Sequence, residues 1–348
     1  QCDQICKFFH IHINIPPIVF IDGTYSLFIV AEISNSLYTL TINLAILIRK
    51  SNNFTNERKL NMSDISLKGV IDMHVHSNPD IRHRAYDDFE LMEAGIRSGA
   101  RAIVIKTHQG TTVDRAYLCN RHNELVHHGD NDFTMFGSIT LNRQMGGINP
   151  SAVESGLKLG GKVVWLPTQS ARNGKIQLDQ PVDGCVDVLR DGKIVPELKD
   201  VFQLIKDFDV VLGTGHISPE ESFRVVEAAR DAGIRKIVIT HPEWWLVGMS
   251  LDDQIRIVKD YDVIPEHCFA QPMGGGKYKS NLPANLDAIK ACGYKNVMVS
   301  TDGGQVENPH WEIALAQYIG YLADHGIPQD EIHYMTHTIQ AGLLGLED

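Results

Sequence analysis

The sequence predicts an α/β protein, a (β/α)8 TIM barrel, on the basis of two observations. From Met62 onward, short runs rich in β-branched residues alternate with stretches of helical period. Eight such runs occur, which is the number of strands that closes a barrel of parallel strands. A doubly wound sheet shares the alternation, but the strand count favours the barrel.

The expected strands lie at 69–75, 101–106, 133–140, 162–166, 209–214, 236–240, 262–266 and 296–301. The expected helices lie at 86–98, 112–127, 218–232, 250–260, 282–292 and 309–325. Ser218 and Pro219 with the acids that follow them form a helix start signal. Asp191-Gly192 predicts a small hairpin turn, and residues 337–346 predict one closing amphipathic helix.

Residues 1–61 differ in composition from the rest of the chain. They contain 11 Ile and 7 Asn but only one of the 29 glycines, and the first methionine is Met62. We therefore expect a non-domain extension, with translated upstream sequence as the hypothesis for its origin, followed by a single metallohydrolase-like barrel domain over 62–348. A membrane anchor in 40–48 is the alternative, but that apolar run is too short to span a bilayer.

The net charge of −11 argues against a nucleic-acid-binding surface and for an acidic, enzyme-like protein without a membrane partner. The six cysteines include no CxxC pair, and a chain of 348 residues needs no disulfide staples. Reduced thiols in a cytoplasmic protein are the expectation. A homo-oligomer stays open.

Polar side chains recur just past the ends of the expected strands, where TIM barrels place their active sites. These residues are His74 and His76, Lys106 and His108, His216, His241, Glu266 and His267, and Asp302. His74 and His76 point to the same side of their strand, because side chains alternate along it. Converging imidazoles are well suited to hold a cation. Asp72 faces the same way and either orients a ligand or caps the barrel.

This ordered set resembles the amidohydrolase superfamily of metal-dependent hydrolases, and within it an uncharacterised branch. The resemblance covers 69–348. It implies that His74, His76 and His216 are metal ligands and that Asp302 is both a ligand and the catalytic proton acceptor. It also implies that His241 either binds a second metal or hydrogen-bonds the attacking water. The expected cofactor is a divalent metal, with Zn²⁺ favoured.

One departure from the superfamily pattern concerns the number of metal ions. Binuclear members place a carboxylated Lys or a Glu at the end of strand 4, where this chain has Thr168 and Gln169. We therefore expect one metal per chain, and a second metal stays possible. Lys106 could supply a bridge if carboxylated, but a plain cation that binds substrate is the favoured interpretation.

Cationic residues in the loops after the strands indicate a small anionic substrate. The expected substrate-binding residues are Lys106, His108, Arg82, Arg143, Arg172, Glu266 and His267. Arg82 is followed by His83 and Arg84, and Trp244 or Trp245 walls the pocket. The expected reaction is hydrolysis of an amide, lactone or ester bond. A nonoxidative decarboxylase on the same scaffold and a non-catalytic binding barrel are the alternatives.

Overall fold

The computed structural model describes residues 20–21, 24–25, 27–33, 36–42 and 65–347, and the chain divides into Gln1–Lys59 and Leu60–Asp348. In the first unit β1 (Phe20–Ile21) pairs with β2 (Thr24–Tyr25), and β3 (Leu27–Ile33) pairs with β4 (Ser36–Ile42), both antiparallel. Most of the apolar run 40–48 lies outside the described residues. None of the helices described is long and apolar enough to cross a membrane. The extension over 1–61 stays a prediction.

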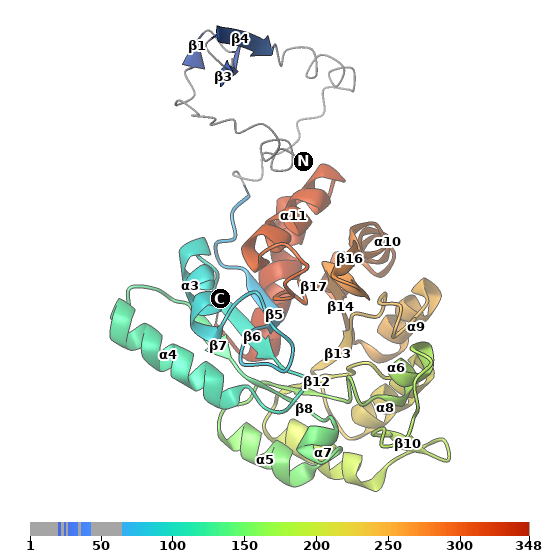
Figure 1. Ribbon diagram of the computed structural model, residues 1–348. Helices are drawn as coiled ribbons and strands as arrows, with labels where there is room; N and C mark the ends of the chain where they lie inside the picture. The colour runs from blue at the N-terminus through green and yellow to red at the C-terminus, as the bar shows by residue number, and fades with distance from the viewer. Residues whose placement is uncertain (1–19, 22–23, 26, 34–35, 43–64, 348) are drawn as a thin grey trace. The chain divides into compact units, whose positions relative to one another are not determined.

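The second unit is the predicted barrel of parallel strands (Figure 1). Its strands are β5 (Ile71–His76), β6 (Ala102–Lys106), β7 (Thr134–Phe136), β8 (Ser138–Thr140), β9 (Val163–Trp165), β12 (Val211–Gly213), β13 (Ile237–Thr240), β14 (Ile264–Cys268) and β17 (Met298–Ser300). Each expected strand is present. The third is divided at Gly137, so that β7 pairs with β6 and β8 pairs with β9.

The barrel closes between its last strand and its first. Val75 of β5 forms a parallel bridge with Gly303, and the N–H of His76 donates to the Gly303 carbonyl at 2.9 Å. Gly304 has φ +95°, and a Cβ there would overlap the carbonyl oxygen of His76. Glycine is therefore required where the two strand ends approach each other.

Helices cover the outside of the strands (Figure 1). They are α3 (Asp88–Ser98), α4 (Val113–His127), α5 (Pro150–Lys158), α6 (Arg172–Gln177), α7 (Pro196–Asp207), α8 (Pro219–Asp231), α9 (Leu251–Tyr261), α10 (Leu282–Cys292) and α11 (Trp311–Asp324). Ser218 caps α8 and forms a capping box with Glu221, as its start signal predicted.

The remaining elements are short. The turn at Asp191-Gly192 joins β10 (Leu189–Arg190) to β11 (Lys193–Ile194), which confirms the predicted hairpin, and β15 (Ala270–Gly274) pairs with β16 (Lys277–Ser280). Single 3₁₀ turns lie at η2 (Arg143–Met145) and η3 (Tyr294–Asn296). The C-terminal segment comprises α12 (Gln329–His333), the π-helix η4 (Tyr334–Thr338) and α13 (Ile339–Leu344). The expectation of one regular helix over 337–346 was therefore wrong at its start.

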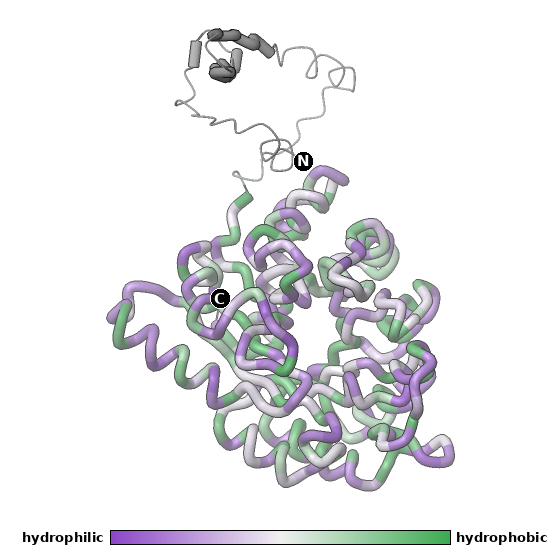
Figure 2. Tube along the Cα trace, in the orientation of Figure 1, coloured by the Kyte–Doolittle hydropathy of each residue, from purple (hydrophilic) through white to green (hydrophobic). Residues whose placement is uncertain are grey.

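The part of the barrel interior that faces α13 is apolar. Met73, Val104, Trp165 and Met298 are fully buried there, and Leu344 of α13 packs against the same cluster. The hydropathy colouring follows the same division, with hydrophobic colour along the central strands (Figure 2). The Nζ of Lys106 lies 4.4 Å from the ring centroid of Trp165, so the polar site begins directly beyond this apolar layer.

Candidate metal centre

Five histidine rings meet at the carboxyl ends of the strands and close into a cycle. Neighbouring centroids lie 5.4 Å apart for His74 and His76, 4.9 Å for His76 and His108, 5.7 Å for His108 and His216, 4.9 Å for His216 and His241, and 5.7 Å for His241 and His74. We call the cycle of five histidines the imidazole ring, and we name the ring of a single residue with that residue, as in the His74 ring. Four of them were predicted to hold or serve a metal, and His108 was predicted as a substrate contact.

The carboxylate of Asp302 lies against two members of this ring. Its Oδ1 is 3.2 Å from Nε2 of His74 and 3.2 Å from Nε2 of His76. Ligand atoms of these three residues lie within 4.8 Å of one another. Two imidazole nitrogens and a carboxylate oxygen are donors that Zn²⁺ and similar divalent ions accept. Gln305 steadies the carboxylate by donating from Nε2 at 3.2 Å.

His74 is held from both sides. Its Nδ1 is 3.0 Å from Oε2 of the fully buried Glu266, and its Nε2 is 2.9 Å from Nζ of Lys106. Burial and Lys106 lower the pKa of His74, but Asp302 and Glu266 outweigh them, and the pKa is raised above its ordinary value. These carboxylates therefore favour positive charge on the His74 ring, which a proton or a cation at Nε2 can supply.

The other four rings are neutral at neutral pH. Burial is the main cause that lowers the pKa values of His76, His108, His216 and His241 well below 6.5. Burial alone would raise the pKa of Asp302, but His74 and His76 hold it well below its ordinary range. Neutral imidazoles around an ionised carboxylate are the protonation states that metal binding requires.

The hydrogen-bond inventory also fits a cation. Nδ1 of His76 and both ring nitrogens of His241 are buried and have no hydrogen-bond partner among the described residues. Buried polar atoms in proteins are almost always satisfied, so three unsatisfied imidazole nitrogens at one place call for an explanation. A metal or its water would satisfy nitrogens of this kind, so the residues present fit the divalent metal that the sequence predicts.

Asp72 connects the first strand to the last from beneath the ring. It accepts hydrogen bonds from the N–H of His74 at 3.0 Å, from Oγ1 of Thr301 at 2.6 Å and from Nε1 of Trp311 at 2.9 Å. Burial is the main cause that raises its pKa to about 6. Asp72 therefore orients the strand that carries His74 and His76.

Two site residues have left-handed backbone conformations at the ends of their strands. His241, which follows β13, has φ +25°, and Asp302, which follows β17, has φ +48°. A residue with a side chain pays on the order of 1–3 kcal/mol for such a conformation, and these conformations concentrate at functional sites. In both cases the turn occurs at the residue that contributes to the candidate centre.

A cavity of about 480 Å³ opens above the imidazole ring. Its charged lining includes four cations, Arg82, Arg84, Lys106 and Lys175, and two carboxylates, Asp302 and Glu307. Trp244, Trp245 and Leu246 supply an apolar wall. Trp244 is buried, and its ring meets His216 and His241 edge-on at 4.7 and 4.5 Å, whereas Trp245 is half-exposed. The lining is thus positive in a protein that is acidic overall.

The structure brings only some of the expected substrate-binding residues to this cavity. Lys106, His108 and Arg82 line it, although Arg82 is paired with Glu307 at 3.0 Å. His108 Nδ1 lies 2.8 Å from Oγ1 of Thr168. The Thr168 hydroxyl, which follows β9, therefore contacts a member of the imidazole ring.

Four other expected residues lie away from the cavity surface. Glu266 lies behind His74, where it contacts the imidazole instead of a substrate. His267 is fully buried with Nδ1 3.0 Å from Oε2 of Glu243. Arg172 forms a two-pronged pair with Asp187 at 2.7 and 3.0 Å. Arg143 is outside the lining as well.

Sequence reasoning gave no role of their own to three residues that the structure places at the site. Arg84 and Gln305 line the cavity, and Glu243 anchors the segment after β13 by accepting from the N–H of Cys268 at 3.1 Å. Arg84 had a visible signal, because it lies in the cationic loop after the first strand. Glu243 had none, since its partners His267 and Cys268 are distant in the sequence, and the contact of Gln305 with Asp302 depends on the turn after β17.

Comparison with solved structures defines the class of fold. An amidohydrolase from Pseudomonas aeruginosa is 12% identical over 80% of this chain and 95% of its own, with a TM-score of 0.57. An organophosphorus hydrolase from Deinococcus radiodurans is 12% identical over 82% of this chain and 94% of its own, with a TM-score of 0.50. The fold is that of amidohydrolase-superfamily barrels, which confirms the resemblance at this level.

The match to a family model identifies a narrower group of proteins than the fold does. Residues 69–266 match a family of unknown function, DUF6282, and because the match spans more than half of the chain, the protein belongs to that family. No curated protein matches the sequence.

Proposed function

We propose that the protein is a metal-dependent hydrolase that uses an activated water to cleave an amide, lactone or ester bond of a small anionic molecule. The observation that carries the proposal is the imidazole ring with Asp302 against two of its members. A barrel used only for binding would have no physical need for five converging imidazoles. Three of their ring nitrogens are buried and have no hydrogen-bond partner among the described residues.

The residues have separable roles. His74, His76, His216 and Asp302 would hold the metal, with Zn²⁺ the favoured ion and one ion per chain. A bound Zn²⁺ polarises a substrate carbonyl and lowers the pKa of its water to about 7. The ionised carboxylate of Asp302 accepts the proton of the attacking water and passes it to the leaving group. His241, whose ring nitrogens are unsatisfied, orients that water.

The substrate is anionic, because the cavity holds four cationic side chains against two carboxylates. We also propose a cytoplasmic enzyme, and free thiols in the described part of the chain support this. Those cysteines are Cys119, Cys185, Cys268 and Cys292.

The test is a metal-dependent turnover assay on the purified full chain. The zinc-loaded and chelator-treated proteins are offered lactones, amides and esters that carry a carboxylate, and the products are followed by NMR in ¹⁸O-labelled water. Metal-dependent products that contain ¹⁸O support the proposal. Release of CO₂ without incorporation of solvent oxygen would establish the decarboxylase instead. A protein that holds its metal but turns over no member of a broad panel would point to the binding barrel.

A further inference from the structure

We propose that Arg84 is the residue that recognises the substrate and that it binds a carboxylate on a molecule whose other face is flat and apolar. The inference rests on the proposed function, because it names the substrate class and a specificity residue of the same site.

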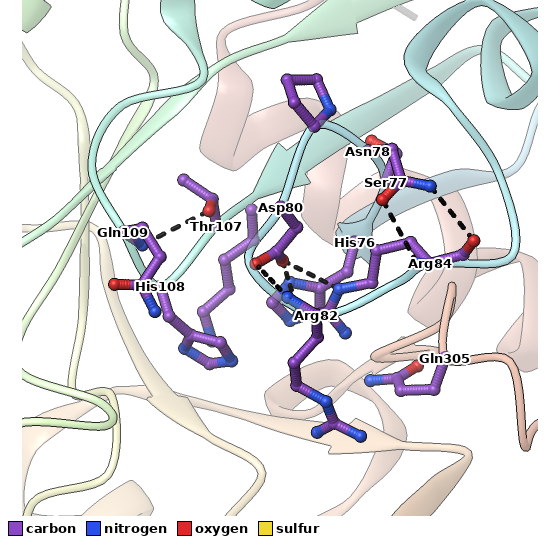
Figure 3. A network of polar contacts seen from close by, with 12 residues as sticks. His76, Ser77, Asn78, Asp80, Arg82, Arg84, Thr107, His108, Gln109 and Gln305 are labelled. Carbon is purple, nitrogen blue, oxygen red and sulfur yellow. Dashed lines mark hydrogen bonds and ion pairs between the residues drawn. The ribbon is translucent and has the colours of Figure 1, made fainter.

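Arg84 is an unusual member of the cavity lining. It is only 2% exposed, yet it lines the cavity, so its guanidinium is buried in the wall of the candidate site. Figure 3 shows it on the loop after β5 together with Asp80 and His76.

The guanidinium is only partly satisfied. Nε and Nη2 both face one oxygen, Oδ2 of Asp80, at 2.8 and 2.7 Å. Within residues 65–347, the buried Nη2 has no acceptor in hydrogen-bonding geometry. Because a guanidinium has five N–H donors in a planar fork, Arg84 keeps donors that fit the two oxygens of a carboxylate.

The loop that carries Arg84 is fixed, so these donors are already in place. The N–H of Ala85 donates to the carbonyl of Gly304 at 2.8 Å, and Arg84 forms an antiparallel bridge with Gln305. The N–H of Asn78 donates to the carbonyl of Tyr86 at 2.8 Å and closes the loop at its base. A preorganised donor loses little freedom when the ligand binds.

The other arginines are less suited to this role. Arg82 is half-exposed, and its Nη2 is paired with Glu307, a residue that itself lines the cavity. Arg172 is paired through two nitrogens with Asp187 and lies outside the cavity. Of these three arginines, Arg84 is therefore the one that is buried, lines the cavity and retains unpaired donors.

The shape of the rest of the ligand follows from the opposite wall. His76, beside Arg84, neighbours His74 and His108 in the imidazole ring, whereas Trp244 packs against the two remaining members. The position at which Arg84 would bind a ligand carboxylate and the wall formed by Trp244 thus lie on opposite sides of the imidazole ring. A ligand that reaches both presents a carboxylate at one end and a flat apolar surface at the other, with its reacting bond over Asp302.

Binding assays on the full chain test this without turnover. The probes are benzoate, benzamide as its neutral isostere, and phenyl phosphate, titrated by calorimetry into zinc-loaded and chelator-treated protein. We expect benzoate to bind more tightly than both other probes. Arg84→Gln should weaken benzoate binding at least tenfold in both forms and leave benzamide unchanged, and the exposed Arg235→Gln serves as the matched control.

A second variant changes affinity in the opposite direction. Asp80 competes with the ligand for Arg84, so Asp80→Asn should tighten benzoate binding several-fold, a result that a purely structural ion pair would not give. It also keeps the test decisive if Arg84→Gln fails to fold.

Equal benzoate affinity in the wild type, Arg84→Gln and Asp80→Asn proteins would overturn the proposal, as would benzoate binding that is lost on zinc removal and insensitive to Arg84. Preference for phenyl phosphate would refute the carboxylate. None of these results depends on hydrolysis, so the proposed function stands or fails separately.

Discussion

Oε2 of Glu266 lies 3.0 Å from Nδ1 of His74, although 192 positions separate the two residues in the sequence. Both side chains are fully buried. A carboxylate behind a metal-binding histidine fixes the orientation of the ring and makes its other nitrogen a better donor. The contact therefore connects strand β14 to the candidate metal ligands of β5.

Replacing this carboxylate tests its role. Glu266→Gln keeps the size of the side chain and an oxygen that accepts the Nδ1 hydrogen, but it removes the charge that favours a cation on His74. We expect zinc affinity to fall about 10- to 100-fold, measured by competition with a chromophoric chelator. Glu93→Gln removes a carboxylate from another His–Glu pair, with His127 at 2.7 Å, outside the cavity lining. Equal loss in both variants would show that the effect is not specific to His74.

The barrel was predictable because its strands are short, buried runs of β-branched residues. The strand expected at 236–240 is observed at Ile237–Thr240, and the one expected at 101–106 at Ala102–Lys106. The third strand was not predictable in detail, since its division at Gly137 depends on two different neighbours. The π-helix at Tyr334–Thr338 likewise has no local signal in an otherwise helical pattern.

The site was predictable only as far as strand ends reveal it. His74 and His76 lie in the second half of β5, and His216, His241 and Asp302 come one to three residues after their strands, so alternation and barrel geometry suffice to bring them together. The roles of Glu266 and Arg172 could not be read in this way. Whether a polar side chain contacts a substrate, an imidazole or a neighbouring carboxylate depends on its partner, and Asp187 beside Arg172 becomes apparent only in three dimensions.

The N-terminal segment should be dispensable for the barrel. A chain that begins at Met62 should keep its melting temperature and metal content, because Ile65 and Leu67 still pack against the core. A chain that begins at Gly69 loses both side chains and should be less stable, by about 1.5–3 kcal/mol for Leu67 alone. Urea unfolding measures both. A large loss of soluble yield from the Met62 chain would contradict the prediction.

Each chain should bind close to one metal ion. Thr168 follows β9, its hydroxyl contacts His108 and Asn142, and this segment supplies no anion to bridge two ions. Elemental analysis of protein dialysed against excess zinc gives the stoichiometry. Two ions at full occupancy, together with a mass increase equal to CO₂ on Lys106, would overturn this expectation, and Lys106→Met would then reduce the content to one.

The metal-free protein should lose stability as the pH falls below 6.5. Four buried histidines have folded-state pKa values well below the ordinary 6.5, chiefly because burial disfavours the charged ring; they are His76, His108, His216 and His241. In that window the unfolded chain binds more protons than the folded one, so acidification favours unfolding, whereas the raised pKa of His74 opposes this trend. Unfolding free energies between pH 8 and pH 5 measure the slope.

A single substitution checks the assignment of that slope. His108→Gln removes one of the four groups, so its unfolding free energy should depend less steeply on pH than that of the wild type. The exposed His325→Gln should leave the slope unchanged. A slope that is flat in the wild type, or identical in the His108 variant, would mean that these rings do not titrate as their burial implies.

The most direct test of the chemistry compares Asp302 with His216. His216→Ala removes an imidazole from the ring, so metal affinity and turnover should fall together. Asp302→Asn preserves the shape of the side chain but removes the charge that lies 3.2 Å from His74 and His76, and with it the proton acceptor. At saturating zinc it should reduce kcat by about 10²-fold or more with a much smaller change in KM. Because Asp302 also helps to neutralise the cation, bound zinc is measured in the same samples. Near-normal turnover of Asp302→Asn with full metal occupancy would refute the hydrolytic mechanism while leaving the fold and the carboxylate-binding role of Arg84 untouched.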